Sequence, residues 1–159
     1  MIASEMPEIR RFLSLTLILA LLAALPGCAT SPQNETTPTG VKLVQQVKRL
    51  VGTPYHYGGN GPEGFDCSGL IQYAYALVGI AIPRTTRGQL KRSRAVKPQD
   101  MRPGDLIFFR LGGRKISHVG MYIGGLMMIH APSGHKSVSY AHLDTGYWRE
   151  HLAAVGRFL

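Results

Sequence analysis

The spacing of the apolar residues changes near Asp105, and this change constrains the fold more than any other feature of the chain. Before it, apolar residues recur at helical spacing over residues 41–50 and again behind Cys67, where Gly79 ends the run. Shorter helices are predicted over residues 86–91 and 147–152. After Asp105, apolar or alternating runs bounded by turn residues predict strands over residues 106–109, 117–123, 126–131, 137–140 and 154–158. Helices followed by an antiparallel sheet indicate an α+β domain with its N-terminal helices packed on the sheet.

The N-terminus has the features of an export signal. Arg10 and Arg11 precede an apolar run over residues 12–25, which has signal-peptide length and is short for a membrane span. The run ends in Leu-Pro-Gly-Cys at Cys28, which resembles the signal of bacterial lipoproteins, in which that cysteine becomes the lipidated N-terminus. We therefore expect a signal peptide over residues 1–27, a lipidated flexible tether over 28–40 and a folded domain over 41–159. The alternative is an ordinary secretory signal with an incidental cysteine, and either Met1 or Met6 is the start.

The chain is strongly basic, with a formal net charge of +9. Nucleic acid is the usual partner for such a charge, but an exported chain rarely meets it and no nucleic-acid motif is present. We therefore expect anionic cell-wall polymer or lipid headgroups as partners, and no nucleic acid. Much of the charge lies between Arg84 and Arg102, and a solvated face is the simpler interpretation of that run.

Cys67 lies at the predicted start of a helix, preceded by a glycine-rich loop. Unpaired backbone N–H groups and the positive end of the helix dipole favour the thiolate there. If Cys28 is lipidated, Cys67 has no disulfide partner and remains a free thiol in an oxidising compartment. The alternative is a buried structural cysteine, which is the commonest fate of a free thiol.

His118 and His130 alternate with apolar residues in two successive predicted strands. They share a face of the sheet only if the turn at Gly124-Gly125 has odd length or contains a bulge, and we predict that form. One imidazole can then accept the Cys67 proton while the other holds it in the productive orientation. A zinc site that adds His135 is the alternative, but the usual zinc spacings are absent, so we expect no metal and no cofactor. His135 is also a second choice for the orienting residue.

Five short motifs occur in order across most of the chain and resemble those of the NlpC/p60 family. They are Tyr55-His56-Tyr57-Gly58-Gly59, Asp66-Cys67-Ser68-Gly69, Pro83-Arg84-Thr85-Thr86, Arg102-Pro103-Gly104-Asp105-Leu106, and His118-Val119-Gly120-Met121-Tyr122-Ile123-Gly124 followed by His130. The resemblance implies a papain-like α+β fold that cuts the peptide stems of bacterial peptidoglycan. It implies Cys67 as nucleophile, His118 as general base and His130 as the orienting residue.

The resemblance also implies substrate contacts. A hydroxyl at Tyr55 would lie near the oxyanion, and Asp66 and Ser68 would hold the substrate's free amine. A helix N-cap is the alternative role for Asp66, whose carboxylate would oppose thiolate formation at Cys67.

The combined expectation is a monomeric, lipid-anchored cysteine peptidase, most similar to the small murein endopeptidase lipoproteins of Gram-negative bacteria. Ala29 after the lipidated cysteine implies the periplasmic face of the outer membrane. The bond cleaved is either D-glutamyl–diaminopimelate or the cross-link between diaminopimelate and D-alanine. An amidase or acyltransferase of the same fold and a non-catalytic wall-binding lipoprotein are the alternatives.

Overall fold

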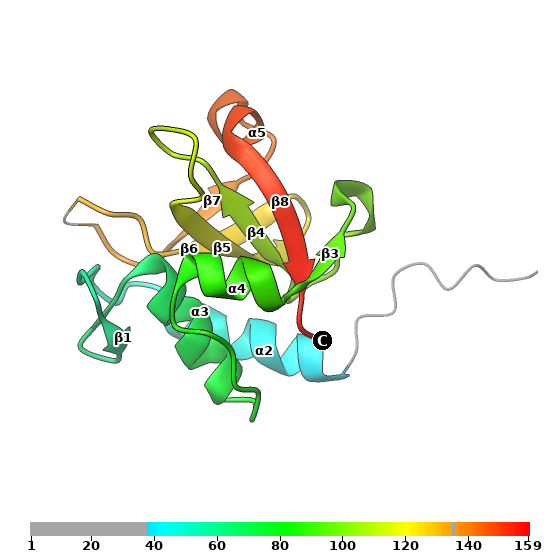
Figure 1. The fold of residues 1–159 in the computed structure, drawn as a ribbon. Coiled ribbons are helices and arrows are strands. Elements are labelled where there is room, and N and C mark those ends of the chain that lie inside the picture. The colour runs from blue at the N-terminus through cyan, green and yellow to red at the C-terminus, as the bar shows by residue number, and fades with distance from the viewer. Residues whose placement is uncertain (1–37, 135) are drawn as a thin grey trace, which may run out of the picture. The chain divides into compact units, whose positions relative to one another are not determined.

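The computed structural model describes residues 38–134 and 136–159 (Figure 1). The predicted signal peptide, Cys28 and most of the predicted tether therefore lie outside the described residues, as does His135. Within the described ranges, no helix has the length and apolar character needed to cross a bilayer.

The N-terminal half is helical, as predicted. Helix α2 spans Pro38–Arg49, so it begins three residues before the predicted start, within the segment assigned to the tether. Proline suits the first turn of a helix because that turn has no use for its missing N–H. Helix α3 spans Cys67–Ala76, and helix α4 spans Thr86–Arg92 with the Thr85 side chain as its N-cap. A two-stranded ribbon, β1 (Asn60–Gly61) and β2 (Gly64–Phe65), occupies the loop before α3 and was not predicted.

The C-terminal half forms a six-stranded antiparallel sheet in the order β3-β8-β4-β5-β6-β7. The strands are β3 (Arg94–Val96), β4 (Leu106–Phe109), β5 (His118–Gly124), β6 (Met127–His130), β7 (Ser139–His142) and β8 (Leu152–Arg157). A 3₁₀ turn (Pro98–Asp100) follows β3, and the short helix α5 (Gly146–His151) precedes β8. The α+β class with helices packed on an antiparallel sheet is confirmed.

The two faces of the sheet have separate cores. Helices α2 and α3 lie below the sheet in Figure 1 and α5 lies above it. Leu70 and Ile71 of α3 pack with Val119 and Met121 of β5 and with Ile129 of β6 in the larger core. The other face carries a smaller core under α5, formed by Ile107, Phe109, Met128 and Leu143. Alternation along β5 and β6 therefore directs the even-numbered residues away from α3.

The β5–β6 hairpin contains the predicted bulge. Met121 pairs with Ile129, but the register shifts by one residue before Gly124 pairs with Met127. Gly124 and Gly125 have φ angles of 95° and 59°, a left-handed backbone that favours glycine. The bulge preserves the parity of the two strands, so His118 and His130 share one face, as predicted.

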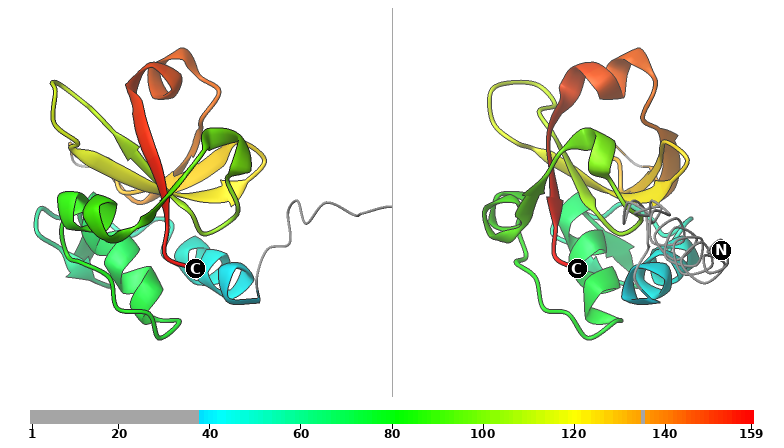
Figure 2. Two further views of the ribbon diagram at one scale, coloured as in Figure 1. Left: turned by 45° about the vertical axis from the view of Figure 1, so that its right-hand side comes forward. Right: turned by 90° about the vertical axis from the view of Figure 1, so that its right-hand side faces the viewer.

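A largely buried ion pair joins the end of β8 to Asp105, the residue just before β4. Arg157 at the end of β8 donates from Nε and Nη2 to the two Asp105 carboxylate oxygens, each at 2.6 Å. The Tyr75 hydroxyl of α3 donates to the Gly104 carbonyl oxygen at 2.8 Å. The helix that begins with Cys67 is thereby held to the turn before β4. Figure 2 shows α2 in cyan and α3 in green on one side of the sheet, and the orange α5 on the opposite side.

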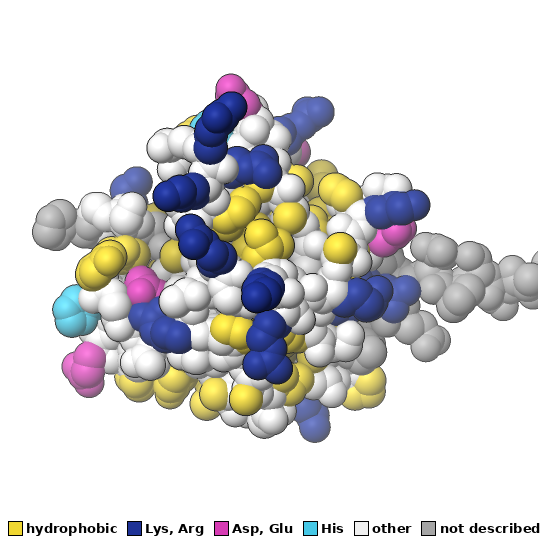
Figure 3. Space-filling view, viewed as in Figure 1, with side chains coloured by type: hydrophobic (Ala, Val, Ile, Leu, Met, Phe, Trp, Pro, Cys, Tyr) yellow, Lys and Arg dark blue, Asp and Glu magenta, His cyan; other side chains and the backbone are white. Residues whose placement is uncertain are grey.

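Basic side chains spread over the face that carries α4 and β3, and Figure 3 shows them among white and apolar surface. The exposed members of the run are Arg87, Lys91, Arg92, Arg94 and Lys97. For these five residues the solvated interpretation of the basic run is confirmed.

Candidate active site

Cys67 is the first residue of α3, and the preceding carboxylate caps the helix. Asp66 accepts a hydrogen bond from the Gly69 N–H at 2.7 Å, so the N-cap role considered for Asp66 is confirmed. The loop before the helix closes tightly on its first turn: the Asp66 N–H donates to the Gly59 carbonyl oxygen. A Cβ on Gly69 would collide with that same oxygen, which explains the glycine two residues after Cys67.

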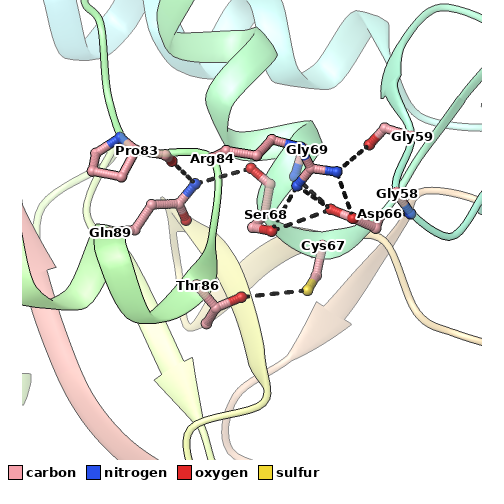
Figure 4. A network of polar contacts seen from close by, with 10 residues as sticks. All are labelled: Gly58, Gly59, Asp66, Cys67, Ser68, Gly69, Pro83, Arg84, Thr86 and Gln89. Atoms are coloured by element: carbon pink, nitrogen blue, oxygen red, sulfur yellow. Dashed lines mark hydrogen bonds and ion pairs between the residues drawn. The ribbon is translucent and has the colours of Figure 1, made fainter.

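Arg84 holds this loop and the helix start together (Figure 4). Its guanidinium binds both Asp66 carboxylate oxygens, at 2.6 and 2.9 Å. The same group donates to the Ser68 hydroxyl at 3.0 Å and to the Gly59 carbonyl oxygen at 3.3 Å. The assignment of Arg84 to a solvated face is therefore wrong. Burial alone would raise the pKa of Asp66, but hydrogen bonds from Arg84 and Gly69 lower it below its ordinary value.

Thr86, the first residue of α4, contacts the Cys67 sulfur. Its Oγ1 lies 3.7 Å from the Cys67 Sγ. Gln89 positions α4 for this contact, because its Nε2 donates to the carbonyl oxygens of Ser68 and Pro83, both at 2.9 Å. The motif that contains Thr86 was recognised in the sequence, but periodicity gave no sign that α4 would reach the sulfur.

The pKa of Cys67 is raised above its ordinary value, first by burial and further by the Asp66 charge. Hydrogen bonding from Thr86 and from the backbone at Val119 and Ser68 opposes the increase without cancelling it. The helix start was expected to favour the thiolate, but burial and the Asp66 charge raise the pKa of the thiol above its ordinary value. The thiol therefore needs a base.

The predicted histidine pair is formed where β5 begins and β6 ends. His118 Nε2 lies 2.9 Å from His130 Nδ1, and both side chains are buried. In the tautomer with the proton on His118 Nε2, this N–H donates a hydrogen bond to His130 Nδ1. His118 Nδ1 then has a free lone pair, as a general base requires. The backbone of Val119, next in sequence to His118, hydrogen-bonds to the Cys67 sulfur, which places the start of β5 beside the thiol.

Burial also keeps both imidazoles neutral. It lowers the pKa of His118 to about 3, with His130 contributing, and lowers the pKa of His130 to about 4, with the Lys136 charge contributing. Trp148 of α5 encloses the pair: its ring stacks on His118 at 5.9 Å and meets His130 edge-on at 5.0 Å. Trp148 was missed because one aromatic residue in a six-residue helix carries no periodic signal.

These pKa shifts predict that the domain loses stability as the pH falls below about 6.5. The unfolded chain takes up protons at His118 and His130 near pH 6.5, whereas the folded protein takes them up only near pH 3 and 4. At pH 5 we expect a loss of about 2 kcal/mol per imidazole relative to pH 8. Urea denaturation at the two pH values measures this, with the His118→Gln/His130→Gln double variant as control. An equal loss in that variant would contradict the assignment to this pair.

Tyr55 lies close enough to Cys67 and Asp66 to feel their charges. The pKa of its phenol is raised by burial and then by the negative charges of Cys67 and Asp66, and its side chain packs against the same core as Cys67. Its N–H donates to the Lys136 carbonyl oxygen at 2.7 Å. Among the described residues, no three His, Cys, Asp or Glu side chains converge in a metal-binding group.

The fold and the site together define a papain-like α+β domain with a thiol at the start of α3 and an imidazole pair where β5 begins. The NlpC/P60 family model matches residues 52–157, and the chain belongs to this family. It is 39% identical over 118 residues to the bifunctional muramidase/DL-endopeptidase CwlT of Bacillus subtilis. This match covers 72% of this chain and 35% of CwlT. It is also 39% identical over 123 residues to the murein DD-endopeptidase MepH of Escherichia coli. That match covers 74% of this chain and 44% of MepH.

A solved structure agrees with this assignment. The crystal structure of an NlpC/P60 family protein from Bacillus cereus superposes with a TM-score of 0.73 at 38% identity, covering 78% of this chain and 41% of that one. The chain thus spans less than half the length of each of these three relatives.

Proposed function

We propose that the protein is a cysteine endopeptidase that hydrolyses an amide bond in peptidoglycan stem peptides. The observations that support this proposal are a thiol at a helix start, the hydrogen-bonded His118–His130 pair, and the backbone hydrogen bond to the Cys67 sulfur from Val119, the residue after His118. The names of the relatives CwlT and MepH support peptidoglycan as the substrate class.

The site residues account for both halves of the reaction. In acylation the Cys67 sulfur attacks the amide carbon while its proton passes to His118, and the resulting oxyanion is stabilised by the Tyr55 hydroxyl and a backbone N–H at the helix start. When the carbon–nitrogen bond breaks, the amine leaves with the proton from His118, and a thioester remains on Cys67. In deacylation His118 takes a proton from the water that attacks the thioester. The carbon–sulfur bond then breaks, the carboxylic acid is released, and His118 returns the proton to the Cys67 sulfur.

We propose that the Arg84 cluster, formed by Arg84, Asp66 and Ser68, contacts the part of the substrate that carries the scissile carbonyl. Asp66 and Ser68 carry oxygens that we propose as contacts for a free amine of the substrate, as the family resemblance implies. Arg84 already occupies both Asp66 oxygens and the Ser68 hydroxyl, so it fixes these acceptors in position and offsets the Asp66 charge next to the nucleophile.

We propose that the amide bond cleaved is one of two in the peptidoglycan stem. Relatives of equal identity are named for DL- and DD-endopeptidase activity, so similarity favours neither D-glutamyl–diaminopimelate nor the diaminopimelate–D-alanine cross-link. Mass spectrometry of purified muropeptides before and after incubation with the protein identifies the bond from the two fragments. Fragments from a different amide or ester would indicate the amidase or acyltransferase alternative. No change in any muropeptide would contradict the proposal.

We further propose that lipid on Cys28 anchors a monomer to the periplasmic face of the outer membrane, for remodelling of the cell wall. The support is the sequence at residues 25–29. We expect Cys28→Ala to move the protein from the membrane fraction to the soluble periplasmic fraction while its specific activity is unchanged. Fractionation with a matched hydrolysis assay measures this. Recovery of the variant in the membrane fraction would contradict lipidation at Cys28.

A further inference from the structure

A cavity of about 390 Å³ lies against the histidine pair. Both imidazoles form part of its wall, and the rest comes from the β4–β5 and β6–β7 loops, strand β7 and helix α5. The lining residues are Leu111, His118, His130, Pro132, Ser133, Lys136, Ser139, Ala141, Tyr147 and Trp148. Cys67 and the Arg84–Asp66 cluster do not line it, so the cavity extends from the imidazole side of the site.

The chemistry of the proposed reaction assigns a substrate fragment to this side. His118 gives its proton to the departing nitrogen, so the amine-side fragment must lie against the imidazole while the acyl fragment stays on the Cys67 sulfur. The cavity is the space next to His118 that can hold such a fragment.

The charge of the cavity is positive. Lys136 is its one charged lining residue, and no Asp or Glu side chain lines it. The three ion pairs found among the described residues do not include Lys136. Its charge acts on the site, because after burial it is the second cause of the lowered pKa of His130. The Ser133 and Ser139 hydroxyls add hydrogen-bond donors on the same wall.

The segment that carries Lys136 is fastened to the active site. The Lys136 carbonyl oxygen accepts the Tyr55 N–H at 2.7 Å. Two residues later, Val138 exchanges backbone hydrogen bonds with Gly52 and Thr53, at 2.9 and 2.8 Å. The backbone of Lys136 is therefore held next to that of Tyr55, while its side chain is exposed.

We propose that this cavity is the leaving-group subsite and that Lys136 pairs there with a free carboxylate on the amine-side residue of the substrate. The inference rests on the proposed peptidase function. At both candidate bonds the amine-side residue is diaminopimelate, which carries a carboxylate at the far end of its side chain or beside the scissile nitrogen. A lysine in the same place has no such group, so Lys136 selects diaminopimelate-type stems with an unmodified carboxylate.

The test compares two muropeptides that differ only in amidation of this diaminopimelate carboxylate. We expect the wild-type protein to cleave the free-carboxylate form with a kcat/KM about tenfold above that of the amidated form. Lys136→Met should lower kcat/KM for the free form to the value for the amidated form, and Lys136→Arg should restore most of the preference. Lys97→Met, which removes an exposed lysine elsewhere, should leave both values unchanged.

The outcomes separate the inference from the function beneath it. Equal wild-type cleavage of the two forms, a preference that survives in Lys136→Met, or an equal loss on both forms would overturn the role of Lys136 while leaving the peptidase intact. Failure of the wild-type protein to cleave either form would overturn the proposed function and the inference with it.

Discussion

Replacing Cys67 with alanine is expected to abolish release of muropeptide fragments, with a fall in rate of about 10⁴-fold or more. The reason is that the proposed reaction passes through a thioester on the Cys67 sulfur, and an alanine cannot form one. The change removes one half-buried sulfur, so the folded structure should persist. Fragment release by quantitative chromatography measures the rate, and the thermal unfolding midpoint of the variant checks the fold.

The same variant separates an enzyme from a wall-binding protein. Cys67→Ala should still sediment with insoluble peptidoglycan, because the Arg84 cluster and the Lys136 cavity are unchanged. Fragment release at the wild-type rate would show that Cys67 is not the nucleophile. A wild-type protein that binds peptidoglycan without releasing fragments would support the non-catalytic alternative.

Replacing His118 with glutamine is expected to reduce the rate by about 10³-fold. The thiol has a raised pKa and cannot ionise unaided near neutral pH, so the reaction depends on the imidazole that takes its proton. Glutamine keeps a hydrogen-bonding side chain of similar length at this position but cannot serve as a base. Turnover of purified muropeptides measures the effect.

His142→Gln is the matched control for this prediction, since His142 lies on β7 with its side chain 63% exposed. We expect its activity to equal that of the wild type. A His118→Gln variant that keeps more than a tenth of the wild-type rate would contradict the assignment of His118 as the general base.

The helix-start cysteine and the shared face of His118 and His130 were predictable because both depend on local pattern. A 3.6-residue period places Cys67 at the start of α3, and a two-residue period with a glycine bulge fixes the parity of the hairpin. The strand over Ser139–His142 was predicted two residues too early, because few apolar residues mark its bounds.

Features that depend on distant parts of the chain were not predictable in this way. Strand β3 is a short, charged edge strand that pairs with β8 about 60 residues later, and its basic residues resemble an exposed loop. Arg84 and Trp148 reach the site only through tertiary packing. The pKa of Cys67 depends on how deeply the helix start is buried, which no local pattern reports.

The proposed reaction requires a thioester on Cys67 during cleavage of the stem peptide. Turnover of a muropeptide in the presence of increasing hydroxylamine detects this intermediate, because a thioester partitions between water and an added amine. We expect part of the acyl fragment to appear as its hydroxamate while the amine-side fragment is still released. Release of the amine-side fragment with only the free carboxylic acid, at every hydroxylamine concentration, would show that no thioester forms on Cys67.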